Sequence, residues 1–101
     1  LQIIGCGFKT LSGIDKLKSL YKFHIRDCRE LTSLNGIDKC EMIELFVAFN
    51  CMKLTTLSSI KDLGNLRKVA VDKCCAQVFD SETMEILERL DNDPNITIEY
   101  N

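Results

Sequence analysis

The feature of this sequence that most restricts its fold is an internal repeat of 22 to 23 residues. Three stretches share the same order of apolar residues and end on a cysteine: Leu17-x-x-Leu20-x-x-Phe23-x-Ile25-x-x-Cys28, Cys40-x-x-Ile43-x-x-Phe46-x-Ala48-x-x-Cys51 and Leu63-x-x-Leu66-x-x-Val69-x-Val71-x-x-Cys74. A fourth, partial copy opens the chain and ends at Cys6, 22 residues before Cys28. A fixed period of this length is the signature of stacked structural units.

Within each unit, alternate residues are apolar, as in the pair Phe23 and Ile25. This period of two predicts a short strand with one buried face. One such strand with its return loop is too small to bury that face by itself. Successive units are therefore expected to stack their strands about 4.8 Å apart in a continuous parallel sheet. The loop residues Leu31, Leu34 and Ile37 are expected to close the core from the other side.

The repeat is similar to that of the leucine-rich-repeat family, whose unit reads L-x-x-L-x-L-x-x-N/C-x-L, and in particular to its short intracellular class. The resemblance covers residues 1–79. It implies an α/β solenoid with a curved parallel sheet of about five short strands. It also implies a ladder of side chains that hydrogen-bond the backbone in the turn after each strand. The cysteines at this position are Cys6, Cys28, Cys51 and Cys74.

Residues 80–101 are expected to form a longer last unit. Asp80 or Ser81 is a favourable helix N-cap, so we expect one helix on the convex side of the sheet. Its apolar stripe is formed by Met84, Ile86, Leu87 and Leu90. The alternating segment 96–101 then predicts a fifth strand, and Asn101 occupies the ladder position. Because strands lie at both ends, the ends would expose core residues. We therefore expect a fragment of a longer chain, the alternative being a complete domain with unusual caps.

The six cysteines are expected to be reduced structural thiols. Cysteine serves as a small buried hydrophobe with a weak donor, and the chain has no C-x-x-C pair for zinc. Disulfides between neighbouring strands remain an open alternative. Reduced thiols favour an intracellular, cytoplasmic compartment. Cys75 alone is expected at the surface, and neither a metal site nor a cofactor is expected.

The concave face of the sheet is predicted to contact a partner. Its third strand places three apolar side chains where a solvated face would have polar ones, which is typical of an interaction site. Arg26 and Asp72 flank this strand with opposite charge and are expected to orient the partner. The predicted contact residues are Ile4, His24, Arg26, Leu45, Val47, Phe49, Ala70 and Asp72. The alternative is that sequence outside this chain covers the strand.

These features favour a protein-interaction scaffold rather than an enzyme. The residues offer no nucleophile–base pair or paired carboxylates. Nucleic acid is an unfavourable partner, because 13 basic against 15 acidic residues form no basic stripe. No apolar run approaches the roughly 18–20 residues of a membrane span. A receptor or adhesin ectodomain and the recognition domain of a larger enzyme complex remain alternatives, and the open ends also predict end-to-end self-association.

Overall fold

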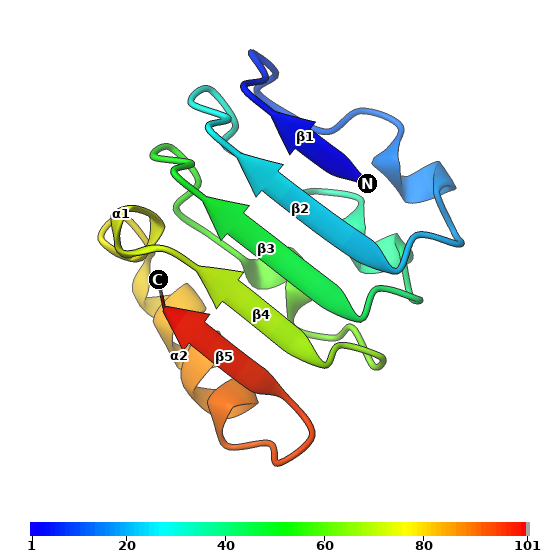
Figure 1. Cartoon of the computed structure of the whole chain (residues 1–101), viewed down its shortest axis with the longest axis vertical. Helices are drawn as coiled ribbons and strands as arrows, with labels where there is room; N and C mark the ends of the chain where they lie inside the picture. The colour runs from blue at the N-terminus through cyan, green and yellow to red at the C-terminus, as the bar shows by residue number, and fades with distance from the viewer. Residues whose placement is uncertain (101) are drawn as a thin grey trace.

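The structure is a computed structural model that describes residues 1–100. The ladder role expected for Asn101 lies outside the described residues, as do the side chains of Cys74 and Ala76. Five strands are present: β1 (Gln2–Ile4), β2 (Lys22–Arg26), β3 (Leu45–Phe49), β4 (Lys68–Val71) and β5 (Thr97–Tyr100). They form one parallel sheet in which strands consecutive in sequence are neighbours in space (Figure 1). The predicted parallel sheet of five short strands is confirmed.

The pairing register places equivalent residues of successive units side by side. Phe23 is paired with Phe46, Phe46 with Val69, and Val69 with Ile98. The first three of these side chains are fully buried, and the Phe23 and Phe46 rings stack with their centroids 5.5 Å apart. Burying one such side chain contributes roughly 1.5–3 kcal/mol, so this column holds neighbouring units together.

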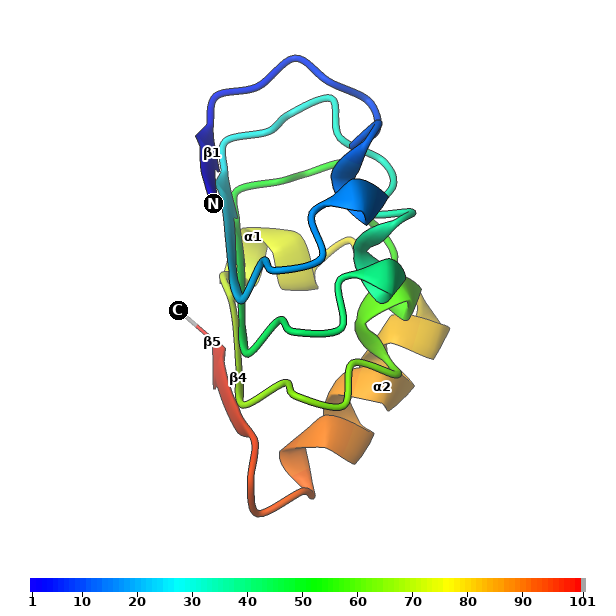
Figure 2. The same ribbon diagram turned by 90° about the vertical axis from the view of Figure 1, so that its right-hand side faces the viewer.

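The return segments lie on one face of the sheet (Figure 2). Three contain a short 3₁₀ helix: η1 (Ile14–Lys16), η2 (Ile37–Lys39) and η3 (Ser58–Ile60). The predicted loop residues Leu31, Leu34 and Ile37 are all buried against the strands. The molecule therefore has two layers, and the opposite face of the sheet is covered by no element of residues 1–100 (Figure 2).

The longer last unit contains the helix expected near the C-terminus, α2 (Ser81–Asp91). The Asp80 carboxylate accepts a hydrogen bond from the Thr83 backbone N–H at 2.8 Å and caps the helix. One detail of the predicted apolar stripe is wrong: Met84 is 44% exposed, whereas Thr83 is buried. The reason is a specific polar contact, because the Thr83 hydroxyl accepts a 2.8 Å hydrogen bond from the backbone N–H of Leu57.

A second helix, α1 (Lys73–Ala76), was not expected. It begins directly after β4, and its N-cap is Asp72, whose carboxylate accepts from the Cys75 backbone N–H at 2.9 Å. The described residues that follow β2 and β3 contain no helix at the equivalent position.

We predict that Gly36→Ala destabilises the fold by about 1–3 kcal/mol. Gly36 has a φ of 103°, and an added Cβ would lie 2.8 Å from Cγ2 of the buried Ile14. The free energy of unfolding, measured by urea denaturation, should report the loss.

Gly64→Ala is the matched control, because a Cβ there meets nothing within 4 Å and its backbone is not left-handed. It should change stability by less than about 0.5 kcal/mol. Equal losses in the two variants would contradict the close packing of η1 on η2.

Candidate interaction surface on the open sheet face

We call the face of the sheet that is turned away from the helices the open face. Its side chains form three rows that cross the strands in register. The middle row is Gln2, His24, Val47, Ala70 and Glu99; the row nearer the strand starts is Lys22, Leu45, Lys68 and Thr97; the row nearer the strand ends is Ile4, Arg26 and Phe49. The register thus brings seven of the eight predicted contact residues, from four units, onto one surface, whereas Asp72 follows the end of β4.

The apolar residues of β3 lie at the centre of the open face. Leu45 and Phe49 are partly exposed, whereas Val47 is only 7% exposed and Ala70 is buried. Because Val47 and Ala70 have so little exposed surface, a partner could reach mainly Leu45 and Phe49. Ile4, at the edge of the sheet, is exposed.

Phe49 contacts two side chains of β2. The guanidinium carbon of Arg26 lies 5.4 Å from the centre of its ring, a cation–π distance. The His24 ring meets Phe49 edge-on, with centroids 5.9 Å apart and an interplanar angle of 83°. His24 Nε2 is buried and has no hydrogen-bond partner among the described residues. The only histidine of the chain thus supports an aromatic side chain.

Three cations border the apolar centre, on β2 and β4. Lys22 and Arg26 are exposed on one side of β3. Lys68, on the other side, forms a 3.1 Å ion pair with Glu99 that leaves both side chains more than 40% exposed. The open face therefore combines an apolar centre with two cations on the β2 side and an ion pair on the β4 side.

Both carboxylate oxygens of Asp72, which was expected to orient a partner, accept hydrogen bonds within the chain. Its Oδ1 accepts from the Cys75 backbone N–H, and its Oδ2 accepts from the Asn50 backbone N–H at 2.7 Å. Asn50 in turn donates from its side chain to Asp27 at 2.7 Å. These contacts link three successive turns, so Asp72 is a structural acceptor.

Asp27 and Asn50 stabilise the fold through these hydrogen bonds, and the sequence analysis did not predict this role. Both have left-handed backbones, with φ of 57° and 54°. Asn and Asp adopt this conformation more readily than other non-glycine residues. The signal available in the sequence was an Asp or Asn directly after each of two predicted strands, at positions 23 residues apart.

Of the cysteines expected to form the ladder, Cys28 and Cys51 are buried and Cys6 is partly exposed. Cys28 and Cys51 are buried and donate to strand carbonyls, Cys28 to Arg26 at 3.6 Å and Cys51 to Phe49 at 3.4 Å. The expectation that Cys75 is exposed is wrong: it is fully buried, and its sulfur accepts from the Cys51 backbone N–H at 3.2 Å. Cys75 lies in the first turn of α1, where the N-cap Asp72 accepts from its backbone N–H.

The environment of each thiol shifts its acidity. Burial raises the pKa of Cys28 to about 12. Hydrogen bonding with the Cys75 thiol lowers the pKa of Cys51 to about 7, and the same contact, with burial, raises the pKa of Cys75. The five cysteines whose side chains are described form no disulfide with one another. In the part of the chain that the structure describes, no three His, Cys, Asp or Glu side chains are arranged to bind a metal.

Comparisons with protein-family models, curated proteins and solved structures return no match for this chain. Among residues 1–100, no helix has both the length and the apolar character needed to cross a membrane.

We predict that Asp72→Ala lowers the free energy of unfolding by about 1–3 kcal/mol, because it removes a helix cap and leaves the Asn50 N–H without its acceptor. Urea denaturation measures the change. Asp62→Ala, which removes an exposed carboxylate, is the control and should be nearly neutral. Equal effects would mean that the Asp72 contacts add nothing to stability.

We also predict an order of thiol labelling in the native protein. Cys6, which is partly exposed, should react with iodoacetamide first, whereas Cys28, Cys40, Cys51 and Cys75 should react only when the fold opens. Peptide mass spectrometry over time reports each site, and unfolding in denaturant should expose all four. Labelling of Cys75 as fast as Cys6 would contradict its buried position.

Proposed function

We propose that this chain is a leucine-rich-repeat solenoid and that its open face binds another polypeptide. The 22- to 23-residue period, the strand in each unit and the buried thiols that follow β2 and β3 support membership of that class. Fold class alone does not define a function, so the binding role depends on the surface.

The observation that carries the proposal is the exposed face of a parallel sheet with an apolar centre. Solenoid proteins use the extended surface that their stacked units create for binding. Here the return segments cover one face only, and Leu45 and Phe49 stay partly exposed at the centre of the other. Partly exposed apolar side chains at the centre of such a face favour an interaction site.

The charges around the centre indicate the kind of partner. Lys22 and Arg26 border the apolar residues on the β2 side, whereas Lys68 on the β4 side is paired with Glu99. The best-fitting ligand is therefore a polypeptide surface whose apolar side chains have carboxylates on the side that faces β2. Such charges favour the correct orientation and faster encounter. Phe49 is fixed by Arg26 and His24 before binding, and a fixed aromatic residue loses little entropy in a complex.

Binding fits the described residues better than catalysis does. His24, the natural candidate for a general base, packs its ring against Phe49 and has its Nε2 buried. The reduced thiols of the core agree with a reducing, intracellular compartment.

We predict that Phe49→Ala weakens capture of the partner by roughly 30-fold, the effect of losing about 2 kcal/mol at an interface hot spot. Immobilised wild-type protein would be exposed to cell extract, and retained proteins would be quantified by mass spectrometry. Arg26→Glu should also reduce capture, because it reverses a charge of the border.

Met52→Ala is the matched control, since Met52 is an exposed apolar residue outside the open face. It should retain the same proteins as the wild type. Circular dichroism would establish that each variant is folded. Unchanged capture by both open-face variants would refute the proposal.

A further inference from the structure

We infer that Asn35 is a site of spontaneous deamidation, and that its conversion loosens the packing of η1 on η2. Asparagine is one of the thermolabile residues of proteins, because the backbone nitrogen of the following residue can attack its side-chain amide. Asn35 precedes Gly36, the N-cap of η2. The return segment that contains it lies on the side of the sheet opposite the open face (Figure 2). The inference therefore does not depend on the proposed binding.

The attacking group, the backbone nitrogen of Gly36, is free to move. Among residues 1–100, neither the Asn35 carbonyl nor the Gly36 N–H has a hydrogen-bond partner. Glycine also has no Cβ that would hinder the approach of its nitrogen to the amide. The peptide group between these two residues can therefore rotate toward the Asn35 side chain without breaking a hydrogen bond.

The group under attack, the Asn35 amide, is open to water. Asn35 is exposed and lines two grooves, one of about 430 Å³ beside η1 and one of about 290 Å³ beside η3. Its backbone N–H donates to the Ser33 hydroxyl at 3.1 Å, but its side-chain amide forms no hydrogen bond with a described residue. Water and base can therefore reach the amide from both grooves.

The other four asparagines of residues 1–100 do not share this freedom. In each case the backbone N–H of the next residue donates a hydrogen bond. These bonds, of 3.1 to 3.2 Å, run from Cys51 to the Cys75 sulfur, from Leu66 to the Leu63 carbonyl, from Asp93 to the Leu90 carbonyl and from Ile96 to the Asp93 carbonyl. The amide of Asn65 is also held, because it donates to the Glu41 carbonyl at 2.8 Å. Asn35 alone among them combines a free amide with a free neighbouring N–H.

The reaction needs only the chain, base and water. Base removes the proton of the Gly36 nitrogen, which then bonds to Cγ of Asn35. The amide C–N bond breaks, and its nitrogen takes up a proton and leaves as ammonia. Water opens the resulting imide ring in one of two places. Opening at Cγ produces aspartate with an ordinary main chain, whereas opening at the backbone carbonyl produces isoaspartate, whose main chain runs through Cβ and Cγ.

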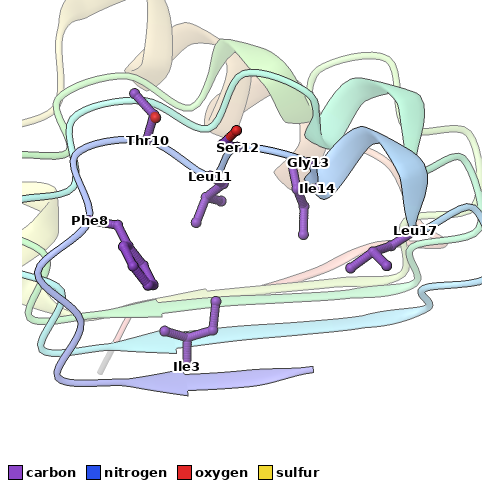
Figure 3. A pocket seen from close by; sticks show the side chains of 8 residues that line it. All are labelled: Ile3, Phe8, Thr10, Leu11, Ser12, Gly13, Ile14 and Leu17. Carbon is purple, nitrogen blue, oxygen red and sulfur yellow. The ribbon is translucent and has the colours of Figure 1, made fainter.

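Isoaspartate adds one carbon to the main chain of a turn that is fixed on both sides. The Ile37 N–H closes this turn by donating to the Leu34 carbonyl at 3.1 Å, and both side chains are buried. Gly36 packs against η1, since a Cβ there would lie 2.8 Å from Cγ2 of Ile14. Figure 3 shows that the Ile14 side chain points from η1 toward the sheet. The added carbon displaces Gly36 and thereby separates η1 from η2.

Incubation of the native chain at several pH values, followed by peptide mass spectrometry, tests the site. The peptide that contains Asn35 should gain about one dalton, because oxygen replaces NH, and the rate should rise with pH because base produces the attacking nitrogen. The peptide that contains Asn65 is the internal control and should keep its mass. Equal conversion of both peptides would overturn the inference. So would a native Asn35 peptide that keeps its mass while it converts in the urea-unfolded chain.

The Cys40 thiol reports whether η1 and η2 separate. It is fully buried and donates to the Ile14 carbonyl at 3.2 Å. In the isoaspartate form, isolated by chromatography, Cys40 should react with iodoacetamide roughly tenfold faster than in fresh protein, which corresponds to about 1.4 kcal/mol less local stability. Cys51, which contacts Cys75 rather than η1, should react at the same rate in both forms.

Two variants separate the change in the main chain from the change in charge. Asn35→Ser gives the turn the Ser12–Gly13 sequence of the preceding unit and should keep its mass. Freshly prepared Asn35→Asp adds the charge without the extra carbon, so its Cys40 should react as in fresh wild type. An isoaspartate form whose Cys40 reacts no faster than this variant would refute the loosening, and a mass gain in the same peptide of Asn35→Ser would refute the site.

Discussion

The register between neighbouring parallel strands is the constraint on which the rest of this structure depends. Phe23 and Phe46 stack because their strands are aligned residue by residue. A shift of one residue would turn every core side chain to the open face. The turn that follows each strand fixes this alignment, because Asp27, Asn50 and Asp72 bond from one turn to the next. The buried thiols below bond the same turns from the core side.

The sheet and its core follow from the spacing of apolar residues, which is why they could be predicted from the sequence. A period of two along each strand and of 22 to 23 between strands determines which side chains share a column. The C-terminal helix was predictable for a similar local reason, since Asp80 is an N-cap ahead of an amphipathic segment. These inferences require only the pattern of apolar residues and the chemistry of single positions.

The features that were missed depend on contacts between units. The two hydrogen bonds that Asp72 accepts were missed because their donors, Asn50 and Cys75, are identified only when the turns are stacked. The burial of Cys75 follows from the helix that Asp72 starts. Thr83 replaces Met84 in the core because its hydroxyl meets the Leu57 N–H of the previous unit. Likewise, the low exposure of Val47 results from the rows on either side of it.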